Sequence, residues 1–258
     1  GEAHVWAADA LFLADAGVLE RLAPSVVVRV GATPTSASLE RWLLDHLGVP
    51  HVVLDAYGRW KDSGATATHY LRADPADALW RLAERVRASA GTEAEEWSDS
   101  WRALWRRADD ASRSVTTERV AGHEGDLTAR VVDALEPGTT LVVSSSMPIR
   151  DVDGYAHPAD RGLEVLANRG ASGIDGVVST AFGVAARREG PTICIIGDVA
   201  FFHDRNGLLW AREPDAAVVF VLIDNDGGGI FHVLPIAEHE PHFTPLFATP
   251  HGVEPRGV

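Results

Sequence analysis

The sequence has little cysteine, methionine and lysine, and no long apolar run. Cys194 is the only cysteine among 258 residues, so no disulfide can form within the chain, and its place in an apolar run predicts a packing role. Lys61 is the only lysine, which leaves arginine as the residue for binding carboxylates or phosphates. No apolar stretch has the length of a membrane span and no signal peptide is visible, so we expect a cytoplasmic protein.

Basic residues are also in deficit, since the formal net charge is −14. A surface of this sign repels phosphate backbones, which excludes nucleic acid as a partner. The length is enough for one large or two small domains, each with a buried core.

The first 90 residues alternate strands with helices. This alternation predicts a Rossmann-like, doubly wound α/β domain over residues 1–90. The expected strands are Ser25–Val30, His51–Asp55 and His69–Leu71, and the expected helices are Ser36–Leu47 and Pro75–Ala90, the second capped by Asp74.

Residues 91–124 are expected to form a helical linker. A helix over 92–110 carries Trp97, Trp101 and Trp105 on one face, at a spacing of four residues. We interpret this stripe as a face packed on a neighbouring domain, and Ser112–Glu124 as a linker.

The pattern of residues 125–258 predicts a second parallel α/β domain. Two doubly wound parallel-sheet domains are therefore the expected architecture. The expected helices are Leu127–Leu135 and Ile174–Arg188, and the expected strands are Thr139–Ser144, Leu163–Leu166, Thr192–Ile196 and Ala217–Ile223.

Polar residues follow two of these strands directly. Gly197-Asp198 comes after one, and Asp224-Asn225 comes after the next. Ligands in open α/β sheets bind beyond the carboxyl ends of the strands, so we expect Asp198 and Asn225 to lie side by side. Carboxylate, amide and carbonyl oxygens suit Mg²⁺, with phosphate oxygens as further ligands, so the pair predicts a site for a metal-bridged diphosphate.

The residues around this pair are less specific. A helix over Phe201–Leu209 would direct free amides at an anion, whereas Gly227–Gly229 is either a close backbone approach to a ligand or an ordinary loop. His203 and Asp204 are interpreted as helix-surface or supporting residues. The later histidines lack zinc spacing and receive no role: His232, His239, His242 and His251.

Two further strand ends carry arginines. In Asn168–Gly176 the glycine spacing does not fit a dinucleotide-binding loop, and Arg169 is either a ligand-binding residue or part of a structural salt bridge. Ser146 and Arg150 lie four residues apart and could share one carboxylate; the alternative is a capping serine and a surface arginine.

Together these motifs resemble one branch of the thiamine-diphosphate enzymes, the menaquinone-biosynthesis synthase family MenD. The resemblance rests on Gly197-Asp198, Asn225–Gly229, Ser146–Arg150 and the string Asn168–Gly176. It covers the second domain closely and the first more loosely. It implies that residues 1–90 are a central domain and that residues 125–258 are a diphosphate- and Mg-binding domain, incomplete at its C-terminus. It implies thiamine diphosphate and Mg²⁺ as cofactors, and decarboxylation of 2-oxoglutarate followed by addition of the succinyl-semialdehyde carbanion to isochorismate.

The resemblance also implies residue roles. Asp198, Asn225 and the Gly227 carbonyl match metal ligands, with Gly197 and Ile174 beside the cofactor. The substrate-binding set is matched by Ser146, Arg150, Arg169, Ile230, Phe231 and Leu234.

The family has an N-terminal domain with a cofactor-activating glutamate, and nothing in this sequence matches that domain. We therefore expect the chain alone to be inactive, with a subunit of the same family supplying that domain and a homo-oligomer as the full-length state. Two alternatives remain: another thiamine-diphosphate enzyme of the acetolactate-synthase or decarboxylase type, and a non-catalytic diphosphate-binding or subunit-interface module.

Overall fold

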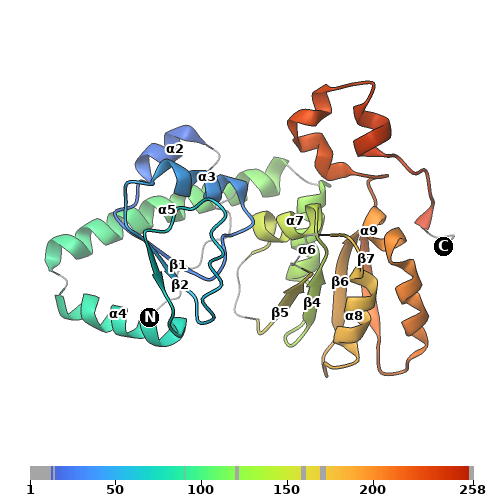
Figure 1. Ribbon diagram of the computed structural model, residues 1–258, viewed down its shortest axis with the longest axis horizontal. Coiled ribbons are helices and arrows are strands. Elements are labelled where there is room, and N and C mark those ends of the chain that lie inside the picture. Colours follow the sequence, from blue (N-terminus) through green and yellow to red (C-terminus); the bar gives the residue numbers. More distant parts are fainter. Residues whose placement is uncertain are drawn as a thin grey trace. The chain divides into compact units, whose positions relative to one another are not determined.

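The computed structural model describes residues 13, 15–89, 91–119, 122–157, 161–168 and 173–255. The chain divides into two compact units, Gly1–Val120 and Ala121–Val258. Each unit contains one parallel sheet with helices packed on it, which confirms the predicted α/β class (Figure 1). Among the described residues, no helix is both long and apolar enough to cross a membrane.

The first unit has a three-stranded parallel sheet in the order β1-β2-β3. Leucine and tryptophan side chains from the helices, including Trp42 and Leu43, form its core. The strands are β1 (Val27–Val30), β2 (His51–Leu54) and β3 (His69–Leu71), and the helices are α2 (Ala16–Arg21), α3 (Ala37–Asp45), α4 (Pro75–Ser89) and α5 (Thr92–Arg119).

Helix starts in this unit follow from capping side chains. The Ser36 hydroxyl accepts a hydrogen bond from the Leu39 amide at 3.2 Å, and the Asp74 carboxylate accepts one from the Asp77 amide at 3.0 Å. The cap expected at Asp74 is therefore confirmed.

Helix α5 is longer than the predicted helix over 92–110, because it runs into the predicted linker Ser112–Glu124 and ends at Arg119. No glycine or proline occurs between Thr92 and Arg119, and the Arg113–Asp109 ion pair at 2.8 Å stabilises the helix at i, i+4 spacing. Trp101 and Trp105 pack against the core of the first unit, with Trp105 edge-on to Trp42.

The second unit has a four-stranded parallel sheet in the order β5-β4-β6-β7. The C-terminal segment after the last strand forms short 3₁₀ turns and one π-helical turn over Thr244–Ala248. The strands are β4 (Thr140–Val143), β5 (Glu164–Ala167), β6 (Thr192–Gly197) and β7 (Val218–Ile223), and the helices are α6 (Glu124–Asp133), α7 (Met147–Tyr155), α8 (Val177–Ala185) and α9 (Asp198–His203).

Alternating side chains of the strands bury both faces of this sheet, as expected of a doubly wound parallel fold. Leu141, Val143 and Ile195 pack with α6 and α7 on one face. Val142 and Cys194 pack with α8 and α9 on the other. The packing role predicted for Cys194 is confirmed, since its side chain is completely buried.

Three helix boundaries differ from the sequence prediction. Helix α6 begins at Glu124, within the predicted linker, and α8 begins at Val177, leaving Ile174 in the preceding loop. Helix α9 begins at Asp198 itself and ends at His203, after which Arg205–Arg212 forms a 3₁₀ helix. The predicted single helix over Phe201–Leu209 is therefore wrong.

Candidate functional site

A cavity of about 360 Å³ opens at the carboxyl ends of β4, β6 and β7. Strand pairing places Gly197 opposite Ile223, so the residues that follow β6 and β7 meet at one edge of the sheet. Predicted site residues that line this cavity are Ser146, Arg150, Ile174, Gly197, Asp198, Asn225, Gly227, Ile230 and Phe231.

Asp198 is the most buried carboxylate of the cavity, with 2% of its surface exposed. One oxygen, Oδ1, accepts a hydrogen bond from the Val199 amide at 2.7 Å. The other, Oδ2, accepts one from the Gly227 amide at 2.8 Å, which links the end of β6 to the loop after β7. The carboxylate is thus fixed by two backbone donors and has lone pairs left for a further ligand.

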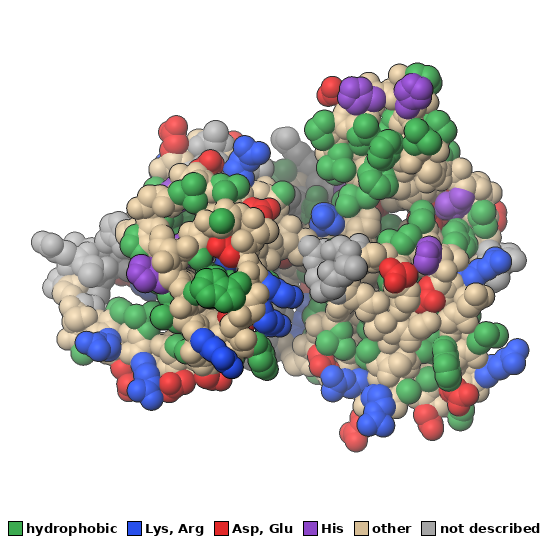
Figure 2. Space-filling model, in the orientation of Figure 1, with side chains coloured by type: hydrophobic (Ala, Val, Ile, Leu, Met, Phe, Trp, Pro, Cys, Tyr) green, Lys and Arg blue, Asp and Glu red, His purple; other side chains and the backbone are tan. Residues whose placement is uncertain are grey.

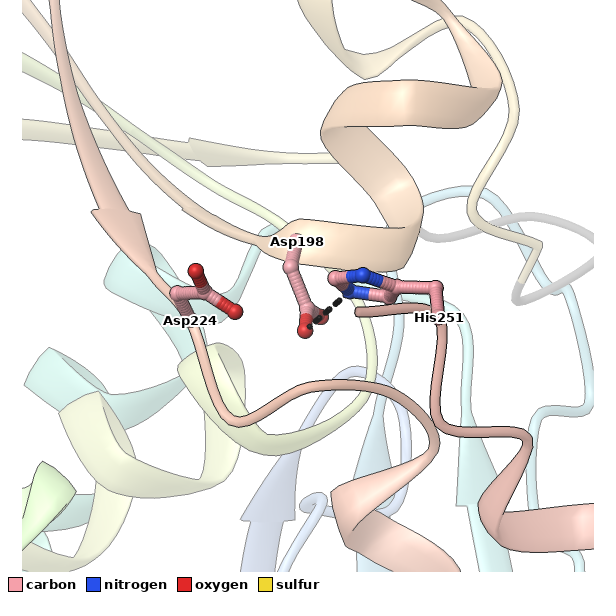
Figure 3. A group of neighbouring side chains, drawn as sticks. All are labelled: Asp198, Asp224 and His251. Carbon is pink, nitrogen blue, oxygen red and sulfur yellow. Dashed lines mark hydrogen bonds and ion pairs between the residues drawn. The ribbon is translucent and has the colours of Figure 1, made fainter. Parts of the chain in front are cut away.

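His251 contacts the same carboxylate, with Nε2 3.0 Å from Asp198 Oδ2 (Figure 3). The Val253 amide donates to the other ring nitrogen, Nδ1, at 3.0 Å. Because Nδ1 accepts, a neutral ring carries its hydrogen on Nε2 and donates it to Asp198. Ligand atoms of Asp198, Asp224 and His251 all lie within 4.8 Å of one another. The sequence prediction gave His251 no role, and only its position between Pro250 and Gly252 hinted at a constrained loop.

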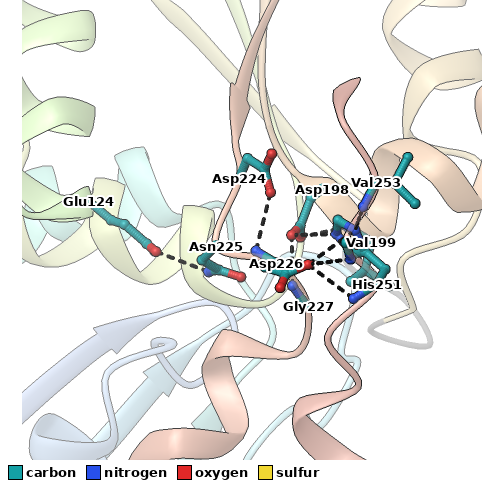
Figure 4. A network of polar contacts seen from close by, with 10 residues as sticks. Glu124, Asp198, Val199, Asp224, Asn225, Asp226, Gly227, His251 and Val253 are labelled. Atoms are coloured by element: carbon teal, nitrogen blue, oxygen red, sulfur yellow. Dashed lines mark hydrogen bonds and ion pairs between the residues drawn. The ribbon is translucent and has the colours of Figure 1, made fainter. Parts of the chain in front are cut away.

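Asn225 is held by a carboxylate from a distant part of the chain. Its Nδ2 donates to Glu124 Oε1 at 3.0 Å, and Figure 4 shows the amide oxygen on the opposite side from Glu124. Glu124 stands in the first turn of α6 and lines the cavity. The sequence prediction gave Glu124 no role, because it placed this residue at the end of the linker, outside the second domain.

The glycine loop after β7 needs glycine for two physical reasons. Gly227 has φ = 139°, a conformation that L side chains rarely adopt, and a Cβ there would lie 2.2 Å from the Ala248 carbonyl oxygen. The Gly228 amide donates to the same carbonyl at 2.7 Å. Close backbone packing therefore holds the Gly227 peptide in the cavity wall.

Ser146 and Arg150 both line the cavity. Ser146 does not act as the capping serine that one of the two alternatives described. Ser146 has φ = 74°, a strained conformation for a residue with a side chain, and its hydroxyl makes no cap hydrogen bond to α7. Arg150 Nη1 instead donates to the Ser146 backbone carbonyl at 2.7 Å. In the part of the chain that the structure describes, no other contact occupies the hydroxyl or the remaining guanidinium donors, so they are available to a ligand.

Leu234 and Arg169 are the remaining predicted substrate-binding residues. Leu234 does not line the cavity, and 44% of its surface is exposed. It belongs to the C-terminal segment, red in Figure 1, where hydrophobic side chains gather on the surface in Figure 2. Arg169 lies outside the described residues. Its neighbour Asn168 lies beside the site, because its carbonyl accepts a hydrogen bond from the Ser145 hydroxyl at 3.3 Å.

Asp151 is a buried carboxyl next to the cavity wall. Its side chain on α7 is 1% exposed, and Oδ2 has no hydrogen-bond partner in the part of the chain that the structure describes. Burial, together with the nearby Glu124 carboxylate, raises its pKa to about 6, although His123 and Arg150 act in the opposite direction.

Asp204 has a supporting role between two helices. Its carboxylate accepts hydrogen bonds from the Ser179 amide at 2.7 Å and from the Ser179 hydroxyl at 3.2 Å. These contacts connect the first turn of α8 to the residue that follows α9, without reaching the cavity lining.

The donors in the cavity fit a magnesium ion. Asp198 offers carboxylate oxygen and Asn225 amide oxygen, and both side chains are already fixed by hydrogen bonds to other groups. Gly227 adds a backbone carbonyl, and a Cβ on Gly197 would meet no atom within 4 Å, so the backbone there is open to a ligand. Hard oxygen donors of this kind are the ones that Mg²⁺ prefers.

Fold and cavity together define an α/β protein whose site lies beyond the carboxyl ends of a parallel sheet, as in many nucleotide- and diphosphate-binding domains. No family model matches the chain. Curated relatives do match it.

Three relatives illustrate the match, and each is named 2-succinyl-5-enolpyruvyl-6-hydroxy-3-cyclohexene-1-carboxylate synthase. The protein from Halorubrum lacusprofundi is 40% identical over 242 residues, covering 90% of this chain and 38% of the relative. That from Halobacterium salinarum is 41% identical over 231 residues, with coverage of 90% and 38%. That from Geobacillus thermodenitrificans is 40% identical over 241 residues, with coverage of 92% and 40%.

The resemblance to the MenD synthase family is thus confirmed. It extends over nine-tenths of this chain, and the chain spans about two-fifths of the length of these relatives.

Proposed function

We propose that this chain is the central and diphosphate-binding part of a thiamine-diphosphate- and Mg²⁺-dependent synthase of the MenD type. The observation that carries the proposal is the meeting of Asp198, Asn225 and Gly227 in one cavity with Ser146 and Arg150. Identity of about 40% to synthases of that name supports the same assignment.

In this proposal, Asp198, Asn225 and the Gly227 carbonyl hold the magnesium ion and through it the diphosphate. Ile174 lies in the cavity wall beside the cofactor ring system, and Ile230 and Phe231 form an apolar wall that excludes water from the reacting carbons. The cofactor, when bound, supplies the carbanion and the electron sink for decarboxylation.

The substrate would be bound through its carboxylates. Arg150 offers the guanidinium donors left free by its bond to the Ser146 carbonyl, and the Ser146 hydroxyl offers a further donor. Arg169 is proposed to join them. This donor set suits a dicarboxylic 2-oxo acid such as 2-oxoglutarate, with isochorismate as the acceptor of the succinyl-semialdehyde carbanion.

Turnover is proposed for an assembly larger than this chain. The relatives are more than twice as long as the segment they share with it. A second subunit of the same family would supply the activating glutamate, so the purified chain alone is expected to show no turnover.

Calorimetric titration of thiamine diphosphate into the purified chain, with and without Mg²⁺, tests this assignment. We expect saturable binding that requires Mg²⁺ and is lost in Asp198→Ala, because that substitution removes a metal ligand and the acceptor for the Gly227 amide.

Asp215→Ala is the matched control, since Asp215 lines a different pocket of the same unit. Binding of equal strength in the wild type and in Asp198→Ala would contradict the proposed metal site.

A further inference from the structure

The bond between Glu124 and Asn225 joins residues far apart in the sequence. Glu124 Oε1 and Asn225 Nδ2 are 3.0 Å apart, and they connect the first turn of α6 with the end of β7 (Figure 4). Both residues line the same cavity as Asp198.

The chemistry of this pair fixes the orientation of the amide. An ionised carboxylate only accepts hydrogen bonds, so it can face the NH₂ end of Asn225 but not its oxygen. The amide oxygen is thereby directed away from Glu124. A hydroxyl or an amide in place of Glu124 would permit both orientations, since each can donate as well as accept.

Glu124 stands at the start of α6, where the helix dipole favours negative charge. Its carboxylate also acts on the neighbouring Asp151: burial and then Glu124 raise the pKa of Asp151, whereas His123 and Arg150 lower it.

We propose that Glu124 is a positioning residue for the metal site: it orients Asn225 so that the amide oxygen, not the NH₂ group, is presented to the cation. This inference rests on the proposed function of Asn225 as a magnesium ligand. Glu124 itself does not act on the reacting atoms.

Replacement of Glu124 tests the proposal through cofactor binding. Glu124→Ala is expected to weaken Mg²⁺-dependent binding of thiamine diphosphate about tenfold, the effect of losing one charge-assisted hydrogen bond. Glu124→Gln is expected to weaken it less, because glutamine can still accept the Asn225 NH₂ hydrogen bond in one of its orientations.

The same Glu124 substitution made in an Asn225→Asp variant shows whether Glu124 orients residue 225 or only supports the local structure. In Asn225→Asp the side chain has two equivalent oxygens, so it needs no orientation, and the Glu124 carboxylate now repels it. Here Glu124→Ala is expected to leave binding unchanged or to strengthen it. Equal weakening in both backgrounds would overturn the proposal.

Asp126→Ala is the matched control, since Asp126 stands in the same first turn of α6 but pairs with Arg130 and does not line the cavity. It is expected to change cofactor binding less than twofold, because the contacts of Asp126 with Arg130 and the Gly122 amide do not involve the cavity lining. If Asp126→Ala weakened cofactor binding as much as Glu124→Ala does, the effect would come from the stability of the helix start and not from the contact with Asn225.

Nuclear magnetic resonance of the metal-free chain separates this inference from the proposed function. The Asn225 side-chain NH₂ signals, identified by their absence in Asn225→Asp, are expected at hydrogen-bonded positions and to move to free-amide positions in Glu124→Ala. If they move while the wild type binds no cofactor, Glu124 still orients Asn225 and the proposed function fails. If they do not move, the inference is overturned whatever the binding result.

Discussion

Single residues in the cavity are held by polar contacts that leave selected atoms free. Asp198 keeps lone pairs after accepting backbone hydrogen bonds, and Ser146 keeps an uncapped hydroxyl in a strained conformation. A strained backbone and buried polar side chains lower the stability of the fold. Substitutions that remove them from the cavity should therefore stabilise the fold and weaken ligand binding.

Asp151 provides a test at this scale. Its pKa of about 6 lies above that of an unfolded aspartate, so the folded state holds the proton more tightly, and stability is lost as pH rises from about 4 to 6. At pH 8 the ionised, buried carboxylate costs on the order of 2–3 kcal/mol.

Asp151→Asn is therefore expected to raise the free energy of unfolding of the second unit at pH 8, by up to this amount, and to change it little at pH 4. Urea unfolding at both pH values measures this. A difference of equal size at pH 4 and pH 8 would show that the charge of Asp151 is not the cause.

In the second unit, a glycine allows the 3₁₀ helix after α9 to pack closely against α8. Gly207, in the 3₁₀ helix Arg205–Arg212, lies directly against α8: a Cβ on it would lie 2.8 Å from the Ser179 backbone nitrogen. By contrast, a Cβ on Gly183, within α8, would meet no atom of a neighbouring element within 4 Å.

Gly207→Ala is expected to destabilise the second unit by about 1–3 kcal/mol, because backbone cannot move aside as a flexible side chain can. Gly183→Ala, the matched control, is expected to be neutral or stabilising by up to about 1 kcal/mol, as alanine favours helix. Thermal unfolding of both variants checks the pair, and similar changes in both would contradict the packing argument.

The described residues of the two units form separate hydrophobic cores, one cluster in the first unit and one on each face of the sheet in the second. Trp42 and Trp105 lie in the core of the first unit, and Cys194 lies in the sheet of the second. Burial raises the pKa of the Cys194 thiol to about 12, so at neutral pH it is neither ionised nor accessible to reagents.

Unfolding is therefore expected to be more than a two-state process. Tryptophan fluorescence should follow the unfolding of the first unit, because all but one of the eight tryptophans precede residue 121. Trp210→Phe removes the tryptophan signal of the second unit. Labelling of Cys194 should follow the second unit. Coincident urea transitions by both probes would show that the chain unfolds as one body.

Local pattern in the sequence determined the parallel α/β class and which strand ends carry polar residues, because apolar runs and capping residues act on their immediate neighbours. Strand ends of one sheet lie together, so Asp198, Asn225 and Gly227 could be grouped in advance. The roles given to these residues by resemblance stay predictions.

Only the tertiary structure decided which distant side chains complete the site. Glu124 and His251 reach Asn225 and Asp198 from helix and loop positions that no local pattern marks, since their contacts are set by how α6 and the C-terminal segment pack on the sheet. The sequence prediction ended the helix of the linker at residue 110, whereas α5 continues to Arg119. Sequence thus determined the sheet edge, and packing determined which side chains meet at it.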